Sequence, residues 1–281
     1  MTPTDEDTLT RLQQALVSNS AVPHYSFTLL LKILTTWPER GVVGGEFAAL
    51  CLLRLLVLQP SAYNYMHDNG NSRVECITHV VARLGERGGE AVAKAAAEGA
   101  QGKTDMACVA MALATVANMF ALPSGVEMVM GAGLSQLALD AALRELHLAG
   151  KPQDGFQNIR LMAGAVMHNF AQHVPPTDGG GAGGAWANAD LSEQATQVLC
   201  GALDGLRTEV DFTVLVRRLK AVAHVLVRCQ KTAADLVVML GLDAELDALN
   251  TGLVPLLPEG AAAAEVRTAL AEAREALAAN R

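Results

Sequence analysis

The stretch Leu113-Ala-Thr-Val-Ala-Asn118-Met-Phe120 carries the pattern that decides the fold, because it recurs further along the chain. A second copy reads Gly164-Ala-Val-Met-His-Asn169-Phe-Ala171, and a third reads Leu219-Lys-Ala-Val-Ala-His224, with histidine in place of the asparagine. These polar positions are 51 and 55 residues apart. Armadillo and HEAT repeats are about 40–47 residues long, and inserted loops would account for the longer spacing. The repeat therefore predicts a solenoid of stacked helices, an architecture that commonly binds extended peptides on a concave face.

Helical periodicity extends over the rest of the chain as well. Apolar residues recur at spacings of three and four in ten ranges: Phe27–Leu34, Phe47–Leu58, Val74–Leu84, Met106–Phe120, Leu134–Leu148, Ile159–Phe170, Leu191–Leu206, Phe212–Cys229, Ala233–Leu249 and Ala261–Ala279. Proline and glycine separate these ranges, and the alternation typical of strands is essentially absent. We predict an all-α, armadillo-like helical-repeat fold (α-solenoid).

The domain organisation follows from the same pattern. Residues 1–28 are predicted to be a polar segment with a first helix, and residues 29–281 to be the helical-repeat domain. Two stretches, Gly85–Asp105 and Thr177–Asp190, are predicted to be flexible loops, although part of the first could form a short surface helix. Helical patterns of the same kind resume after each loop, so neither is predicted to be a linker between domains.

Composition excludes several classes of function. The formal net charge is −8, which argues against general nucleic-acid binding because no net positive field attracts a phosphate backbone. The chain begins with a polar run and shows no signal peptide. The longest apolar run, Phe47–Leu58, is too short to span a bilayer, so we expect no membrane partner. The five cysteines have neither zinc-ligand nor redox spacing and are expected to be reduced thiols, as in a protein of the cytoplasm or nucleus.

The range Phe212–Cys229 carries a stripe of basic side chains. At about 100° per residue, Arg217, Lys220, His224 and Arg228 fall within one narrow arc, opposite an apolar arc. No aspartate or glutamate stands at helical spacing to relieve their repulsion. A solvated face of an amphipathic helix is the alternative. Because His224 occupies the repeat position, we expect this stripe on the inner surface of the solenoid.

Arg54 and the two repeat asparagines are the other candidate binding residues. Apolar neighbours surround Arg54 on every side of its helix, so its guanidinium must pair, reach solvent or face a groove. The alternative is an internal ion pair, for which Glu46 is the local candidate. Asn118 and Asn169 lie in the middle of helices and could hold an extended peptide backbone through their amides. They could also bond to the ends of neighbouring helices, and the two roles can coexist.

Patterns typical of enzymes and cofactor sites are weak. Cys76 and His79 stand one helical turn apart, without a supporting acid or an oxyanion hole. Gly131-Ala-Gly133 follows no strand, and the glycine run at 179–184 lacks the ending of a phosphate-binding loop. His168 and His173 flank Asn169 without a carboxylate or cysteine at metal spacing. We expect no catalysis, no metal and no cofactor.

Two motifs near the N-terminus resemble the start of a PUL domain, the C-terminal module of phospholipase-A2-activating protein and its fungal relatives. They read Leu29-Leu-Leu-Lys-Ile-Leu-Thr-Thr-Trp-Pro38 and Leu52-Leu-Arg54-Leu-Leu-Val-Leu-Gln-Pro-Ser61. Further blocks agree in order, and they are Ala117–Phe120, Asn158–Phe170 and Leu240–Asp243. The resemblance extends from about Leu29 to the C-terminus.

The resemblance implies an armadillo-like fold without enzymatic activity. It also implies a partner, the acidic C-terminal tail of the AAA ATPase valosin-containing protein, and hence an adaptor in ubiquitin-dependent processes. Arg54 matches an arginine of the first family motif, and Arg217 matches one near the start of a later helix. Ala114 stands where family members often have arginine, so one groove charge is missing. The alternatives are a scaffold that binds ubiquitin or another peptide and, less favoured, a cysteine hydrolase.

Overall fold

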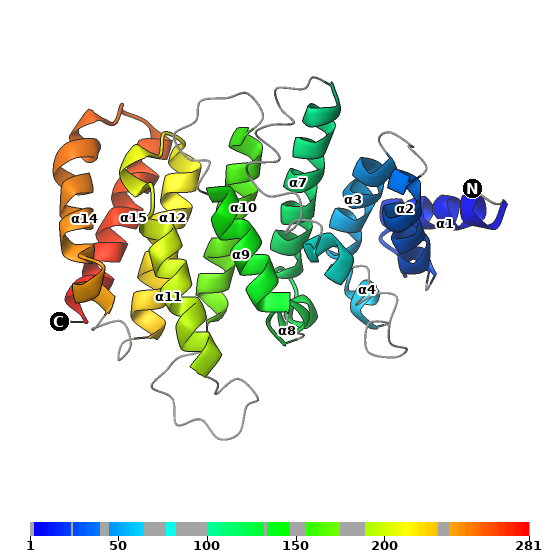
Figure 1. Ribbon diagram of the computed structural model, residues 1–281, viewed down its shortest axis with the longest axis horizontal. Helices are drawn as coiled ribbons and strands as arrows, with labels where there is room; N and C mark the ends of the chain where they lie inside the picture. The colour runs from blue at the N-terminus through cyan, green and yellow to red at the C-terminus, as the bar shows by residue number, and fades with distance from the viewer. Residues whose placement is uncertain are drawn as a thin grey trace. The chain divides into compact units, whose positions relative to one another are not determined.

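Helices are the only regular structure in the residues that the computed structural model describes (Figure 1). The described residues are 3–23, 25–39, 45–64, 77–82, 100–131, 134–146, 156–174, 189–229 and 236–280. The chain divides into two units, Met1–Ala141 and Ala142–Arg281. The predicted all-α helical-repeat fold class is confirmed.

The first unit is a series of helices that pack on their neighbours. Helix α1 packs on α2, α2 on α3 and α3 on α7, while α8 contacts both α7 and the short α4. Leu12, Leu30, Leu53 and Leu113 are fully buried between these helices. The helices of this unit are α1 (Pro3–Ser18), α2 (Ser26–Glu39), α3 (Gly45–Leu56), α4 (Pro60–Asn64), α7 (Ala100–Met119), α8 (Pro123–Gly131) and the start of α9 (Leu134–Leu146).

Two prolines begin helices in this unit rather than only separating them. Pro60 is the first residue of α4 and Pro123 the first of α8, where the missing N–H of proline costs no helical hydrogen bond. The close approach of α7 and α8 requires glycine at position 125, because a Cβ atom there would collide with the Met119 carbonyl oxygen and the Tyr63 hydroxyl. That hydroxyl donates to the Val57 carbonyl at 2.7 Å, and burial raises the pKa of Tyr63.

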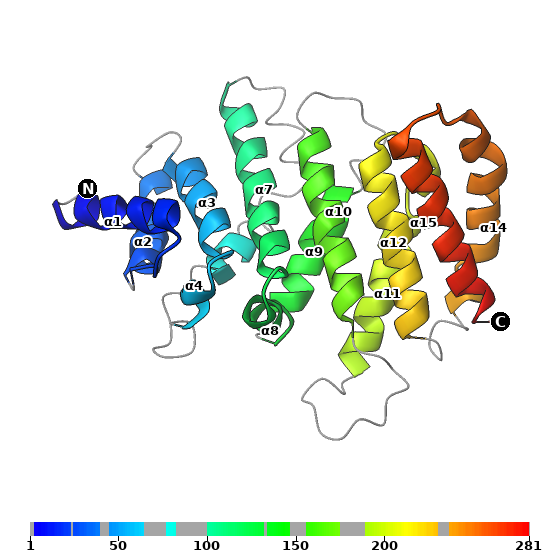
Figure 2. The same ribbon diagram turned by 180° about the vertical axis from the view of Figure 1, so that it is seen from behind.

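The second unit is built around three long helices that lie side by side. Helices α10, α12 and α15 pack in this order, α11 packs against α10 and α12, and α14 packs against α15 (Figure 2). The bounds are α10 (Phe156–His173), α11 (Ala189–Leu203), η1 (Leu206–Thr208), α12 (Phe212–Arg228), α14 (Leu242–Ala248), the π-helical turn η2 (Leu249–Leu253), η3 (Val254–Leu256) and α15 (Ala261–Ala278).

Helix α12 is the centre of this unit, and its sequence explains its position. Asp211 caps its N-terminus by accepting from the main-chain N–H groups of Thr213 and Val214 at 2.9 and 3.1 Å. The apolar arc predicted from the sequence is buried. Leu215 and Leu226 are fully buried and Leu219 is 1% exposed. Burying a side chain of this size contributes about 1.5–3 kcal/mol.

Two predicted boundaries differ from the structure. The predicted helix Ala233–Leu249 is interrupted at Gly241, whose φ of 60° lies in the left-handed region that favours glycine, and α14 begins after it. Helix α7 begins at Ala100, so residues 100–105 of the first predicted loop are helical. The remainder of that loop, and residues 177–188 of the second, lie outside the described residues.

Within the described ranges, no single helix has the length and apolar composition needed to cross a membrane. The helical segments Thr104–Met119 and Pro123–Met130 have that length and composition only when they are taken together, and the chain bends by 115° between them.

Candidate functional site

In the first unit, Asn118 joins two helices. Its Nδ2 atom donates to the main-chain carbonyl of Arg54 at 2.9 Å, which ties α7 to the last turn of α3. Carbonyl groups in the last turn of a helix have no partner within the helix, so an amide from the next helix satisfies one of them. Of the two roles considered for Asn118, bonding to a neighbouring helix end is the one that the structure contains.

The Arg54 side chain is half-buried on α3, between the buried Leu53 and the exposed Leu55. Its Nε atom is buried and has no hydrogen-bond acceptor among the described residues. The ion pair with Glu46, which was the alternative, is not found in the described part of the chain. A buried N–H without an acceptor costs free energy, so an acidic ligand that supplied one would be favoured here.

In the second unit, the basic stripe of α12 lies along α10. Arg217, Lys220 and His224 are partly exposed and Arg228 is exposed. The Nη1 atom of Arg217 donates to the Leu161 carbonyl of α10. The Nη1 atom of Arg228 donates to the carbonyl of Val174, just beyond the end of α10, at 3.1 Å.

The stem of Arg217 also packs on α10 at Gly164. A Cβ atom at Gly164 would lie 3.6 Å from Cδ of Arg217, an ordinary contact distance. Nearby on α10, the main-chain oxygen of Asn169 lies 2.8 Å from Nδ1 of His173. One end of the stripe is thus bonded to α10 and the other to the residue that follows it, with Lys220 and His224 between them.

The stripe brings together two imidazoles that sequence reasoning did not pair. The ring centroids of His168 on α10 and His224 on α12 are 5.3 Å apart, and the planes are tilted by 43°. Burial, followed by electrostatic repulsion from His224 (when protonated), Lys220 and Arg217, lowers the pKa of His168 to about 4. Burial also lowers the pKa of His224, with Arg228 and Lys220 acting in the same direction and Glu272 opposing them. Both rings are therefore uncharged at neutral pH.

Comparison with known families adds the identity of the domain. The family model of the PUL domain matches residues 1–250. The chain belongs to the PUL domain family. PUL domains are protein-binding modules, so this chain is a protein-interaction module with a protein partner. The match includes residues 1–28.

Other comparisons concern the fold of this PUL domain. No curated protein matches the chain. A crystal structure of an engineered protein, from the Northeast Structural Genomics Consortium, is similar with a TM-score of 0.56 and 16% identity. The similarity covers 90% of this chain and 80% of that one. At this identity the likeness concerns the fold alone.

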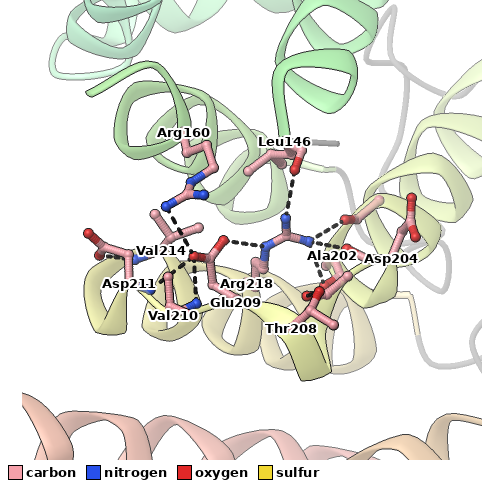
Figure 3. Close-up of polar contacts among 12 residues, drawn as sticks. Leu146, Arg160, Ala202, Asp204, Thr208, Glu209, Val210, Asp211, Val214 and Arg218 are labelled. Carbon is pink, nitrogen blue, oxygen red and sulfur yellow. Dashed lines mark hydrogen bonds and ion pairs between the residues drawn. The ribbon is translucent and has the colours of Figure 1, made fainter. Parts of the chain in front are cut away.

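The second unit of the PUL domain also contains a buried polar cluster that sequence reasoning missed (Figure 3). Arg218 is fully buried, and its guanidinium donates to the carbonyls of Gly201 and Leu146 at 3.0 and 3.1 Å. It also donates to the Asp204 carbonyl. These oxygens lie at the ends of α9 and α11, so one side chain satisfies helix ends that would otherwise lack partners.

The carboxylate of Glu209 completes this cluster. It accepts from the main-chain N–H groups of Val210 and Asp211 at 3.0 and 2.9 Å. Its oxygens lie 3.6 Å from Nη2 of Arg160 and 3.9 Å from Nε of Arg218. Burial lowers the pKa of Arg218, and the nearby Glu209 opposes that change. The only signal in the sequence was an arginine on the apolar arc of α12, next to Leu215 and Leu219.

The thiol-hydrolase alternative gains no support from the described geometry. Cys76 lies outside the described residues, and His79 lies in the helical segment 77–82. Among the described residues, no three histidine, cysteine or acidic side chains are grouped so that they could hold a metal ion.

Proposed function

We propose that this PUL domain binds the acidic C-terminal tail of the AAA ATPase valosin-containing protein, as an adaptor in ubiquitin-dependent processes. The observation that carries the proposal is the stripe of Arg217, Lys220, His224 and Arg228 on one face of α12, in a chain whose net charge is −8. A local excess of positive charge in an acidic protein favours an acidic ligand at that place. Membership of the PUL family supports a peptide ligand.

The chemistry of the stripe suits carboxylates. A guanidinium carries five N–H donors in a planar fork. Arg228 uses its Nη1 atom to donate to the Val174 carbonyl. The remaining donors can bind a carboxylate through charge-assisted hydrogen bonds. Lys220, about two helical turns before Arg228 on α12, adds a more mobile positive charge.

The first unit has a candidate contact of its own. Arg54 has a buried Nε without an acceptor among the described residues, and we propose that its guanidinium binds a carboxylate of an acidic peptide. Asn118 acts there as a positioning residue, because its amide holds the Arg54 main chain. Asn169 is proposed to hold the peptide backbone in the second unit. We also propose the cytoplasm or nucleus as the location, consistent with free thiols at Cys51 and Cys200.

Calorimetry with a peptide of the last ten or so residues of the ATPase tests the proposal. Lys220→Ala is the cleanest substitution, since Arg217 and Arg228 also bond to the main chain around α10. Removing one partly exposed charge contact is expected to weaken binding about fivefold, a loss of about 1 kcal/mol. Arg54→Ala is expected to weaken it by a similar factor.

Arg207→Ala is the matched control, because it removes the same charge from an exposed side chain that pairs with Glu245 at 2.7 Å. Binding should be unchanged in this variant. Failure of the unmodified protein to bind the peptide would refute the proposal, as would equal losses in Lys220→Ala and the control. Capture of ubiquitin in place of the ATPase would favour the scaffold alternative.

A further inference from the structure

The two imidazoles on the α10–α12 face lie in an unusual electrostatic setting. His168 and His224 come from different helices, yet their ring centroids are only 5.3 Å apart. The Nε2 atom of His168 lies 3.4 Å from the amide nitrogen of Gln172, a neutral group on the same helix. Neither ring is in the interior of the unit, because both residues are partly exposed. A ligand can therefore reach the pair from solvent.

The charged groups around the pair are mostly positive. From α12, Arg217, Lys220 and Arg228 act on one ring or the other. From α15, the single acidic contribution is Glu272, which acts on His224. Asp211 at the start of α12 acts on Arg217 rather than on the rings.

Two imidazoles and three permanent cations thus face one acidic group among the described residues. Partial burial lowers the pKa of both rings, and the neighbouring positive charges lower it further, so both rings are neutral at neutral pH. Without a ligand, each of the two rings could therefore still take up one proton.

An anion at this place changes the balance. A carboxylate next to the rings offsets the field of the surrounding cations and accepts hydrogen bonds, so each imidazolium becomes easier to form. A protonated ring has two N–H donors where a neutral ring has one, and charge-assisted bonds are stronger than neutral ones. The anion and the protons therefore stabilise each other in the site.

We propose that His168 and His224 together bind one carboxylate of the acidic tail and are protonated from solvent when it binds. This rests on the proposed function and adds His168 to the site, together with a dependence on pH. No covalent bond changes, and the only transfer is of protons from water or buffer to the ring nitrogens.

The direction of the pH effect follows from linkage. The histidines bind protons more tightly when the anion is present than when it is absent, so affinity rises as the pH falls through the pKa values of the bound form. Each proton taken up in full contributes up to about tenfold in affinity per pH unit. The carboxylates of the tail stay largely ionised above pH 5.5, so they do not cancel the effect.

Calorimetry of the full chain with the ten-residue tail peptide at pH 7.5 and 5.5 tests this proposal. Binding is expected to be about tenfold or more tighter at pH 5.5. Heats measured in two buffers of different ionisation enthalpy should show net proton uptake at the lower pH. The double substitution His168→Gln with His224→Gln keeps polar side chains that cannot titrate. It should lose more affinity at pH 5.5 than at pH 7.5.

His173→Gln is the control for this experiment. His173 lies on the same helix, with its ring bonded to the Asn169 main chain, and its substitution should leave the pH response intact. A second measurement uses the unmodified protein, so it does not depend on the folding of any variant. Two of the seven histidine signals in an NMR titration should show raised pKa values when the peptide is present.

The outcomes separate this proposal from the function on which it rests. Binding of equal strength at both pH values, without shifted histidine signals, overturns the histidine proposal and leaves tail binding standing. A pH response that persists in the double variant overturns it as well. No binding at either pH removes both proposals. A pH response that is lost in the double variant and kept in His173→Gln supports it.

Discussion

The repeat position of Asn118 and His224 has different contacts in the two units. In the first unit it is Asn118, whose amide donates to a carbonyl in the last turn of the adjacent helix α3. In the second unit, on α12, it is His224, whose ring centroid lies 5.3 Å from that of His168 and whose neighbours in the stripe are cations. An amide at this position has a structural bond already formed. An imidazole there is a titratable group, and the cations that act on it outnumber the acidic Glu272.

Asn280 shows that the structural form of this contact also occurs in the second unit. Its Nδ2 atom donates to the carbonyl of Leu226, in the last turn of α12, at 3.0 Å. Leu226 is the third residue from the end of α12, as Arg54 is the third from the end of α3. Asn118 and Asn280 thus each join two neighbouring helices, while the ring and charges of the α12 stripe remain candidates for binding a ligand.

The largest expected effect is a loss of stability in the second unit when the fully buried Arg218 is replaced. Arg218→Met removes the donor to several helix-end carbonyls and one of the two cations near the Glu209 carboxylate. Removing one member of a buried charged network costs about 3–5 kcal/mol, to be measured as the free energy of unfolding in urea. Arg207→Ala, at an exposed pair, should cost less than about 1 kcal/mol. Equal losses in both variants would show that the cluster contributes little.

The next effect is a loss of stability at acidic pH, and it tests the role of the imidazole of His168. His168 has a pKa of about 4 in the folded protein and about 6.5 when unfolded. Because the unfolded chain binds the proton first, the free energy of unfolding should fall as the pH drops from about 6.5 to about 4. Partial exposure weakens the effect, which we expect to be about 2 kcal/mol or less. Urea unfolding at pH 7 and pH 4.5 should show a smaller difference in His168→Gln, and an unchanged difference would contradict the assignment.

The smallest effect tests the hydrogen bonds by which the amide groups of Asn118 and Asn280 join neighbouring helices. Asn118→Ala removes the donor to the Arg54 carbonyl and should lower the free energy of unfolding by about 1 kcal/mol. Asn280→Ala, which removes the corresponding donor to Leu226, should cost a similar amount. Hydrogen exchange at the last turn of α3 should quicken in Asn118→Ala alone. A variant that matched the unmodified protein in both measurements would mean that this contact is dispensable.

Much of the fold was predictable from the sequence because it rests on local patterns. Spacings of three and four gave the helices, and the apolar arc of α12 was placed correctly because Leu215, Leu219 and Leu226 repeat with the helical period. The interruption at Gly241 was missed because the apolar pattern continues across it. Helix α8 was missed because Pro123 was treated as a separator, although proline also fits the first position of a helix.

The candidate site was predictable only where it lies on one helix. The stripe on α12 needs no tertiary information, since helical geometry alone aligns its members. The pairing of His168 with His224, and the cluster of Arg160, Glu209 and Arg218, bring together residues from different elements. No spacing within one helix encodes such contacts. Whether the predicted binding residues contact a peptide stays a prediction.

The bonds from Arg217 and Arg228 to the main chain around α10 have a consequence for binding entropy. Long, flexible side chains usually lose rotamer freedom when a ligand arrives, at a cost of about 0.5–1.5 kcal/mol each. Here two guanidinium groups are already restrained by carbonyl oxygens, so most of that loss occurs during folding. An acidic chain that docks on α12 would meet preorganised donors, and its own ordering would be the main entropic cost of the complex.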